Sequence, residues 1–374
     1  MLIKTFKYKL EPNRKQKVLL NSTLDVCREL YNMGLEQRKM QRVGQFEQMR
    51  QVTALKSEFP EYKTVHAHVL QNVIKKLNRS FENFFRRCKE GGKVGFPRFK
   101  GRDRYDSFQF NNTGFNLSGR HLQLSKIGNV KVRLSRELPK GAVIKTCTVK
   151  RSVSGWFATL IVETTSQPLP VSELEVGIDV GISHFAALSD GTFVPNPRFY
   201  ENGQAELRRA QRKVSRRHKS SNRRRKAVIL LRKVHERIAN KRLDFLHKHS
   251  TAIVQKFGLI AIEDLNVAGM SKGNLAKQIL DASWSTWRRL LFYKAEWAGR
   301  TKVAVPPQYT SQECDECEFI HKDNRKSQAE FECIACGHKD NADTNSSKRI
   351  LARARKQLGR ICPSNVNIPV VVGV

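Results

Sequence analysis

The sequence predicts a multidomain α/β protein. A small N-terminal β-barrel carries an inserted α-helical region, and a mixed α/β domain carries an inserted four-cysteine zinc ribbon. Apolar and polar residues alternate at 2–10 and through 106–163, as in half-buried strands. Between these segments, apolar residues recur at helical spacing. Beyond residue 174, short apolar strands carry acidic residues, and two Cys-x-x-Cys pairs follow.

The charge of the chain indicates its class of partner. The 374 residues include 69 Lys and Arg against 34 Asp and Glu, a net charge of +35. Such a surplus strains a compact fold unless a polyanion neutralises it, so nucleic acid is the expected partner. No segment approaches the ~20 apolar residues of a membrane span, and no signal sequence opens the chain. We therefore expect a cytoplasmic, nucleoid-associated protein without a membrane partner.

The N-terminal region is expected to form one strand and two helices. Residues 2–10 alternate as a strand, and Asn13 is a favourable N-cap for an amphipathic helix over about 13–42. A second amphipathic helix is expected at about 64–88. Residues 91–104 mix glycine, aromatic and basic side chains, which suits either a phosphate-contacting loop or an ordinary connector.

Strands dominate the next region. The clearest are 143–150 and 156–163, joined by a turn at Ser154 and Gly155. Together with the first strand they are expected to close the small barrel. Residues 166–172 are predicted to form a linker.

A new pattern begins at residue 174. Turns at Gly181 and at Asp190–Gly191 predict an antiparallel meander of three strands. Asp179 is expected in the middle of the first strand, between apolar neighbours, where a buried carboxylate is costly unless it is paired or binds a cation. The alternative is a surface aspartate on an edge strand. A later apolar strand ends at Glu263, which places a second acid at the tip of a core strand.

A basic helical region is predicted at residues 204–249. More than half of the positions in 208–226 are Lys or Arg, a density that favours a phosphate track over a solvated face. A helix around 284–297 and a short strand over 301–307 follow. The residues assigned to the phosphate track are Arg212, Arg216 and Arg217.

Four cysteines form two Cys-x-x-Cys pairs: Cys314, Cys317, Cys333 and Cys336. Fifteen residues separate the pairs, a spacing at which two tight turns can offer four thiolates to one tetrahedral Zn²⁺. We expect a structural zinc ion here. Asp343 follows at the start of a short helix, which indicates that the ribbon is an insertion in a larger domain.

Asp179, Glu263 and Asp343 thus come from three separate elements of a mixed sheet. Hydrolysis of a phosphodiester needs an activated water and stabilisation of the departing oxygen, and two Mg²⁺ or Mn²⁺ ions can supply both. Hard divalent cations prefer oxygen ligands, so a carboxylate cluster is the expected holder. We assign Asp179 to bridge the two ions, with Glu263 and Asp343 completing one site each.

These motifs carry a family resemblance. GIDVG around Asp179, IAIEDL around Glu263 and the Asp343-Thr-Asn motif resemble the split motifs of RuvC-like (RNase H-fold) nucleases as found in the TnpB family. TnpB proteins are insertion-sequence-encoded relatives of type V CRISPR nucleases. The LQNVIKKLNRSFENFF, VGFPRFK and PQYTSQEC segments also match, and the resemblance covers roughly residues 2–351.

The resemblance implies an RNA-guided DNA endonuclease of a transposable element. It would act as a monomeric ribonucleoprotein with a guide RNA from the transposon end, and cut double-stranded DNA beside a short transposon-adjacent motif. Gln71 and Asn112 are the residues expected to read that motif. The implied domains are a wedge barrel at 1–12 and 105–168, a helical recognition region at 13–104, a RuvC-like domain at 173–308 and 340–358, a zinc ribbon at 309–339, and a tail at 359–374.

Two positions depart from the family pattern. Glu318 stands where the first cysteine turn usually has glycine, which is expected to perturb that turn without removing a ligand. Ala342 stands where an arginine usually precedes the last acid, so this chain is not expected to have that cation beside Asp343. The alternatives to the guided nuclease are a nuclease-inactive RNA-guided repressor and a guide-free nucleic-acid-binding protein. The complete set of three acids favours the nuclease.

Overall fold

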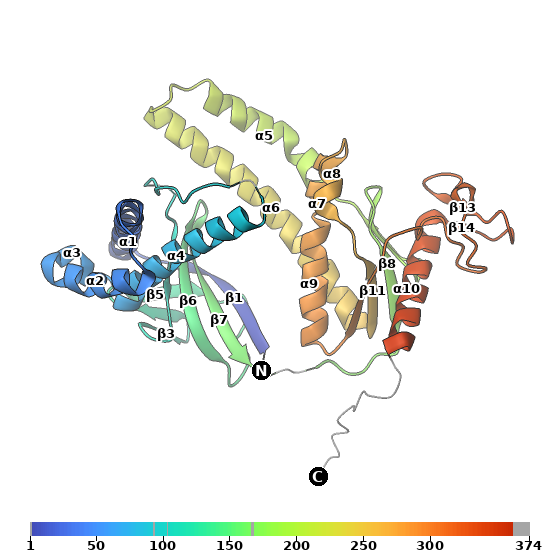
Figure 1. Cartoon of the computed structure of the whole chain (residues 1–374), viewed down its shortest axis with the longest axis horizontal. Coiled ribbons are helices and arrows are strands. Elements are labelled where there is room, and N and C mark those ends of the chain that lie inside the picture. The colour runs from blue at the N-terminus through green and yellow to red at the C-terminus, as the bar shows by residue number, and fades with distance from the viewer. Residues whose placement is uncertain (1, 93, 103, 166–167, 362–374) are drawn as a thin grey trace, which may run out of the picture. The chain divides into compact units, whose positions relative to one another are not determined.

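A computed structural model describes residues 2–92, 94–102, 104–165 and 168–361 (Figure 1). The chain forms two compact units, Met1–Thr165 and Ser166–Val374. The tail expected at 359–374 lies outside the described residues from position 362 onward. None of the helices in the described ranges is long and apolar enough to cross a membrane.

The first unit is built on a seven-stranded antiparallel sheet with the order β2-β6-β7-β1-β5-β4-β3. The predicted strands and their turn are confirmed, and β1 pairs with β7 and β5. The end strands β2 and β3 are not paired with each other among the described residues, so hydrogen bonding does not close the expected barrel. The strands are β1 (Leu2–Glu11), β2 (Ser107–Phe110), β3 (Phe115–Ser118), β4 (His121–Leu124), β5 (Gly128–Arg133), β6 (Val143–Ser152) and β7 (Gly155–Thr164).

Helices α1 (Arg14–Met40) and α4 (Ala67–Lys89) are the two amphipathic helices that the sequence predicts. Asn13 caps α1 in a capping box with Gln16, as expected of an Asn at this position. Helices α2 (Gln45–Glu58) and α3 (Pro60–Lys63) lie between them and were not predicted. The apolar faces of the helices and the inner face of the sheet form one continuous core.

The second unit contains a five-stranded mixed sheet with the order β10-β9-β8-β11-β12. Strands β8 and β12 run parallel to β11 on either side of it, and the predicted meander supplies the antiparallel strands β9 and β10. These strands are β8 (Glu175–Asp179), β9 (His184–Leu188), β10 (Phe193–Pro195), β11 (Leu259–Glu263) and β12 (Thr301–Val305).

Helices cover both faces of this sheet, as Figure 1 shows for α9 (Trp284–Trp297) and α10 (Ala342–Ile361). Alternate residues of β11 face opposite ways: Ile260 and Ile262 join the core formed with α6 and α9, whereas Leu259 and Ala261 join the core formed with α10. The sheet is therefore buried on both sides, which fixes the positions of the residues at its strand ends.

The basic region forms two helices, α5 (Phe199–Ser215) and α6 (Asn222–Lys256), joined by a turn within the most basic stretch. Two short helices, α7 (Val267–Met270) and α8 (Ala276–Ala282), precede α9. The ribbon lies between β12 and α10 and contains the short strands β13 (Glu330–Glu332) and β14 (Lys339–Asn341).

Candidate active site and zinc ribbon

The three predicted acids lie at the ends of neighbouring elements. Asp179 is the last residue of β8 and Glu263 is the last residue of β11. Because β8 and β11 are parallel neighbours, their carboxyl ends meet at one edge of the sheet. Asp343 lies in the first turn of α10, which packs on the same sheet. The expectation that Asp179 lies in mid-strand is therefore wrong, and so is the edge-strand alternative, because β8 is central in the sheet.

Asp179, Glu263 and Asp343 line one pocket of about 260 Å³. Their ligand atoms are spaced more widely than those of a compact one-ion site. Two groups of possible metal ligands in the described ranges have all their ligand atoms within 4.8 Å of one another. One is the four cysteines, and the other is Asp315, His338 and Asp340. The three acids do not form such a group. Lys348 bridges both carboxylates of the second group, at 3.2 and 2.7 Å.

Charge repulsion and burial act together on the acids. Burial, the Glu263 carboxylate and the Asp343 carboxylate raise the pKa of Asp179 well above its ordinary value, and Arg325 opposes the rise. Burial also raises the pKa of Glu263, which is 7 % exposed and accepts a hydrogen bond from the Thr310 hydroxyl. Cations that bind between these groups would relieve this repulsion, so the donor set suits hard divalent ions.

One arginine from the ribbon faces the acids. Arg325 Nη2 lies 3.1 Å from Asp343 Oδ1, and Arg325 lines the acid pocket. Ala342, the position where the family usually has arginine, is fully buried in the small ribbon core with Cys314 and Cys333. In this chain position 342 supplies no cation, and Arg325 is paired with Asp343.

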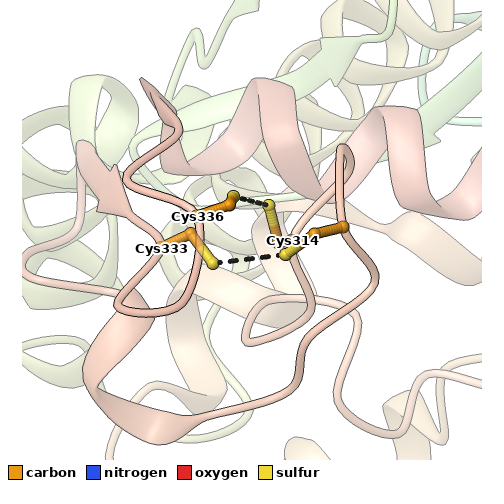
Figure 2. A group of neighbouring side chains, drawn as sticks. Cys314, Cys333 and Cys336 are labelled. Atoms are coloured by element: carbon orange, nitrogen blue, oxygen red, sulfur yellow. Dashed lines mark hydrogen bonds between the residues drawn. The ribbon is translucent and has the colours of Figure 1, made fainter.

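The four cysteines meet as predicted. Cys314 Sγ lies 3.8 Å from Cys336 Sγ, and Cys317 Sγ lies 3.5 Å from Cys333 Sγ. Figure 2 shows the labelled thiols pointing toward one another. A tetrahedral zinc with Zn–S bonds of about 2.3 Å requires sulfur–sulfur distances of about 3.8 Å, so the thiols fit the ion.

The electrostatics of the second cysteine turn favour a thiolate at Cys333, whereas the pKa of Cys336 is raised by hydrogen bonds from neighbouring thiols. Burial opposes ionisation of Cys333, but backbone N–H groups of its turn and two neighbouring thiols outweigh it and lower the pKa of Cys333 to about 7. Glu318 and Gly337 close the two turns, both in the left-handed region, with φ of 61° and 73°. The substitution at 318 thus leaves the turn intact, although a non-glycine residue is strained there.

The ribbon is tied to α10 by polar contacts. The buried Asn345 side chain donates to Glu313 O at 2.8 Å and accepts from the Asp315 N–H at 3.0 Å. Glu313 is itself buried between Arg349 and Arg353 of α10. The helix that carries Asp343 and the first cysteine turn are therefore held together.

The residues predicted to contact nucleic acid lie on exposed or half-exposed positions. Asn72 of α4 donates to Asn111 Oδ1 at 2.9 Å, which brings Gln71 and the exposed Asn112 onto adjoining elements of the first unit. In the second unit, the three predicted arginines are exposed around the end of α5 and the turn that follows it: Arg212, Arg216 and Arg217.

Three contributors to the acid site were not predicted. Thr310, Arg325 and Gln328 line the acid pocket, and Gln328 Nε2 donates to Ser183 Oγ at 2.8 Å. They lie just before or within the ribbon, in segments without a periodic pattern. Thr310 lies in the PQYTSQEC segment that matches the TnpB family, but for Arg325 and Gln328 the only signal was closeness in sequence to the cysteines, which favours a zinc role as much as an active-site role.

This chain is similar to known proteins over almost its whole length. Residues 159–274 match the OrfB_IS605 family model, described as "Probable transposase", and 284–350 match the Cas12f1-like TNB domain. Residues 1–43 match a model described as a helix-turn-helix domain, although here they form strand β1 and the single helix α1.

Two relatives cover most of this chain. A protein of Escherichia coli (strain K12) named as the RNA-guided DNA endonuclease InsQ is 33% identical, over 94% of this chain and 92% of its own length. A protein of Streptomyces pristinaespiralis, named as an RNA-guided DNA endonuclease, is 34% identical over 93% and 89%. The solved structure of the mini-RNA-guided endonuclease CRISPR-Cas_phi3 has a similar fold, with a TM-score of 0.54 at 10% identity over 94% of this chain and 92% of that one.

Proposed function

From the premise that this chain belongs to the OrfB_IS605 family, whose matched relatives are named as RNA-guided DNA endonucleases, we propose that it is an RNA-guided DNA endonuclease of transposon origin. The main support for a cutting activity is that Asp179, Glu263 and Asp343 line one pocket. Three acids facing each other in a chain of net charge +35 would repel a nucleic-acid substrate unless cations bind between them. This favours the nuclease over the repressor and the guide-free binder.

The acids are proposed to hold two divalent metal ions, with Asp179 shared between the ions. Asp179 ends the central strand of the sheet, beside the strand that ends in Glu263, and this position supports the shared role. The wider spacing of the three carboxylates also suits ligands shared by two ions better than ligands of one. When bound, Mg²⁺ or Mn²⁺ would activate a water molecule and stabilise the departing 3′ oxygen.

The protein's own residues orient this site. Thr310 donates its hydroxyl hydrogen to the Glu263 carboxylate, and the same hydroxyl oxygen lies 3.1 Å from Pro307 O. Arg325 holds Asp343 and reduces the repulsion that Asp179 experiences. The four-cysteine site, with one structural Zn²⁺, is proposed to keep these ribbon residues in place.

The guide and the target are assigned on the family premise. We infer a guide RNA from the transposon end and a double-stranded DNA target beside a short adjacent motif, in a monomeric ribonucleoprotein. A net charge of +35 can hold an RNA–DNA duplex by its backbone, while base pairing supplies sequence specificity. Gln71 and Asn112 are proposed to contact the adjacent motif, and the three arginines at the end of α5 and in the α5–α6 turn to contact phosphates.

The test is reprogramming. The protein is purified with the transcript that overlaps the 3′ end of its gene, the guide segment is replaced, and cleavage is mapped. The cut is expected to move to the new matching site only when the adjacent motif is present. Cleavage indifferent to the guide would overturn the guided function.

Asp179→Ala is the matched variant in the same assay. It should bind guide and target as the parent does, because it removes a metal ligand but also a negative charge near the phosphates. Cleavage should be lost. An Asp179→Ala protein that cuts at the parental rate would place the active site elsewhere.

A further inference from the structure

A second pocket, of about 410 Å³, lies against the acid pocket in the same unit. Val180, Glu263 and Leu265 line both pockets, so the end of β11 forms part of the wall between them. Helices α7 and α9 supply much of the remaining lining. Because the two pockets share Glu263, a group that fills the second pocket lies beside the carboxylates.

The walls of this pocket are apolar and aromatic, with one polar group that has no partner. Ile262, Val267 and Phe292 line it together with Trp284. Trp284 is 5 % exposed, and its indole Nε1 has no hydrogen-bond partner among the described residues. That nitrogen is itself covered, so the accessible wall is apolar and aromatic, which suits a flat apolar group.

Basic side chains also line this pocket. Arg288 is paired with Asp264 and lies 5.4 Å from the centre of the Phe292 ring, and Lys302 is paired with Glu296. Arg289 is exposed and has no ion pair within the described part of the chain. A ligand with a flat apolar body and an attached anion matches these features, and a nucleotide has both.

We propose that this pocket receives one unstacked base of the DNA strand being cut, the base adjoining the scissile phosphate. Phe292 contacts the base, Trp284 forms part of the apolar wall behind it, and Arg289 contacts the neighbouring phosphate. The inference rests on the proposed nuclease function and adds a subsite to it. A base held out of the stack fixes the phosphate attached to it, and it can enter only from a strand that is locally unpaired.

The first test changes the DNA. The guided complex is given targets in which the nucleotide on one side or the other of the cut bond is replaced by an abasic residue. One of these two targets should be cut about 10-fold more slowly, because loss of one base–aromatic contact typically costs this much. An abasic residue several nucleotides away should have little effect.

The second test changes the pocket. Val267→Trp fills it, so this variant should cut the normal target about 10-fold more slowly and should no longer distinguish the abasic target from the normal one. Trp284→Phe keeps an aromatic ring but makes the wall smaller, and should raise the KM for target DNA without moving the cut. Leu280→Trp is the control, since Leu280 is 60 % exposed on α8 and does not line the pocket.

A 2-aminopurine at the sensitive position gives a readout that does not depend on cutting. In the Asp179→Ala complex its fluorescence should change on binding, and the Val267→Trp substitution should remove that change. If both flanking abasic targets are cut at the normal rate, the pocket holds no base and the inference is overturned. It is also overturned if Val267→Trp weakens guide RNA binding instead. Absence of guide-directed cutting by the parent protein would instead refute the proposed function.

Should Val267→Trp fail to fold, the abasic targets and Trp284→Phe still decide the question. Folding is checked by circular dichroism and by retention of guide RNA. Equal cutting of all targets by both the parent and Trp284→Phe would contradict the assignment.

Discussion

At the scale of single residues, the carboxylates of the acid site repel one another. Asp179 is surrounded by two other carboxylates, and the opposing cation is Arg325. A carboxyl group whose pKa is raised by folding stabilises the protein below its unfolded pKa, and this contribution is lost as the pH rises through the folded pKa. Without divalent cations, the ionised acids therefore destabilise the second unit at neutral pH.

Replacement of Asp179 by asparagine should expose this effect. Without added divalent cations, Asp179→Asn should increase the free energy of unfolding at neutral pH by on the order of 1 kcal/mol, and the gain should shrink as the pH falls from the raised pKa toward the pKa of the unfolded chain, about 4. Urea denaturation from about pH 5 to 8 measures it. The control is Asp264→Asn, which neutralises an exposed acid next to Glu263. An equal or larger gain in the control would contradict the assignment of repulsion to the acid pocket.

Removal of the ribbon arginine should change the pH dependence of cutting. Arg325→Gln deletes the cation that opposes the raised pKa of Asp179, so the acidic limb of the pH–rate profile should move to higher pH. At neutral pH the rate should fall by about 10-fold and recover in part as the pH increases. Lys322→Gln, an exposed position on the same ribbon, should leave the profile in place. A profile that does not move would remove Arg325 from the site.

The sequence identified the acids but not the residues that hold them. Asp179 and Glu263 stand at the ends of apolar strands, where the local pattern itself makes a carboxylate conspicuous. Thr310 and Arg325 reach the acids only because the ribbon folds back on the sheet, with Arg325 18 residues before its partner Asp343. No local periodicity encodes such a contact.

At the scale of secondary structure elements, the position of α10 depends on one glycine. A Cβ on Gly177 of β8 would lie 2.0 Å from Ser347 O and 2.8 Å from Leu351 N, both backbone atoms of α10. Only a residue without a side chain allows this approach, so the close packing of α10 on β8 fixes where Asp343 lies.

Gly177→Ala should therefore move the third acid. We expect a loss of about 1–3 kcal/mol in the free energy of unfolding and a fall in cleavage of at least ~10-fold, because α10 must shift away from β8. Guide RNA binding should be retained. Gly273→Ala is the control, as its Cβ would lie 3.9 Å from its nearest heavy atom, Met270 O. Normal cleavage by Gly177→Ala would show that α10 can shift without moving Asp343.

The ribbon should need its zinc ion to hold Thr310 and Arg325 against the acids. Elemental analysis should find about one zinc per chain, and Cys314→Ser should lose it, because the ribbon has a core of only a few residues. Cleavage should fall with the zinc content, since Arg325 and Thr310 lose their positions. Cys88→Ser, an exposed cysteine on α4, should retain both. A metal-free ribbon that stays folded would disprove the zinc assignment.

Strongly patterned elements were predicted well and weakly patterned ones were not. Helix α4 has a continuous apolar stripe, from Val69 to Phe81, and its extent was predicted within three residues. Helix α2 buries only Gln48 and Val52, so its sequence has no stripe to recognise. The predicted closure of the barrel was not confirmed, because closure depends on where β2 and β3 end rather than on the pattern within any strand.

At the scale of the whole molecule, the surplus of positive charge should appear as salt dependence. Changing the three predicted arginines of the α5–α6 turn together to glutamine should reduce the slope of log K for guide RNA against log salt by about 2–3, if each contacts one phosphate. Filter binding across a KCl series measures it. The charge-matched control changes three exposed ribbon lysines: Lys322, Lys326 and Lys339. An equal loss of slope in the control would show that only the total charge matters.

The order of the acids along the chain has a consequence during translation. Asp343 follows Glu263 by 80 residues, and the whole ribbon is synthesised between them. At about 5–20 residues per second, the ribosome needs roughly 4–16 s to pass from the second acid to the third. Throughout that interval the nascent chain already contains the first unit and the basic helices but only two of the three acids. A growing chain can therefore engage RNA before it is able to cut DNA, and a chain that stalls in the ribbon would remain a binder without nuclease activity.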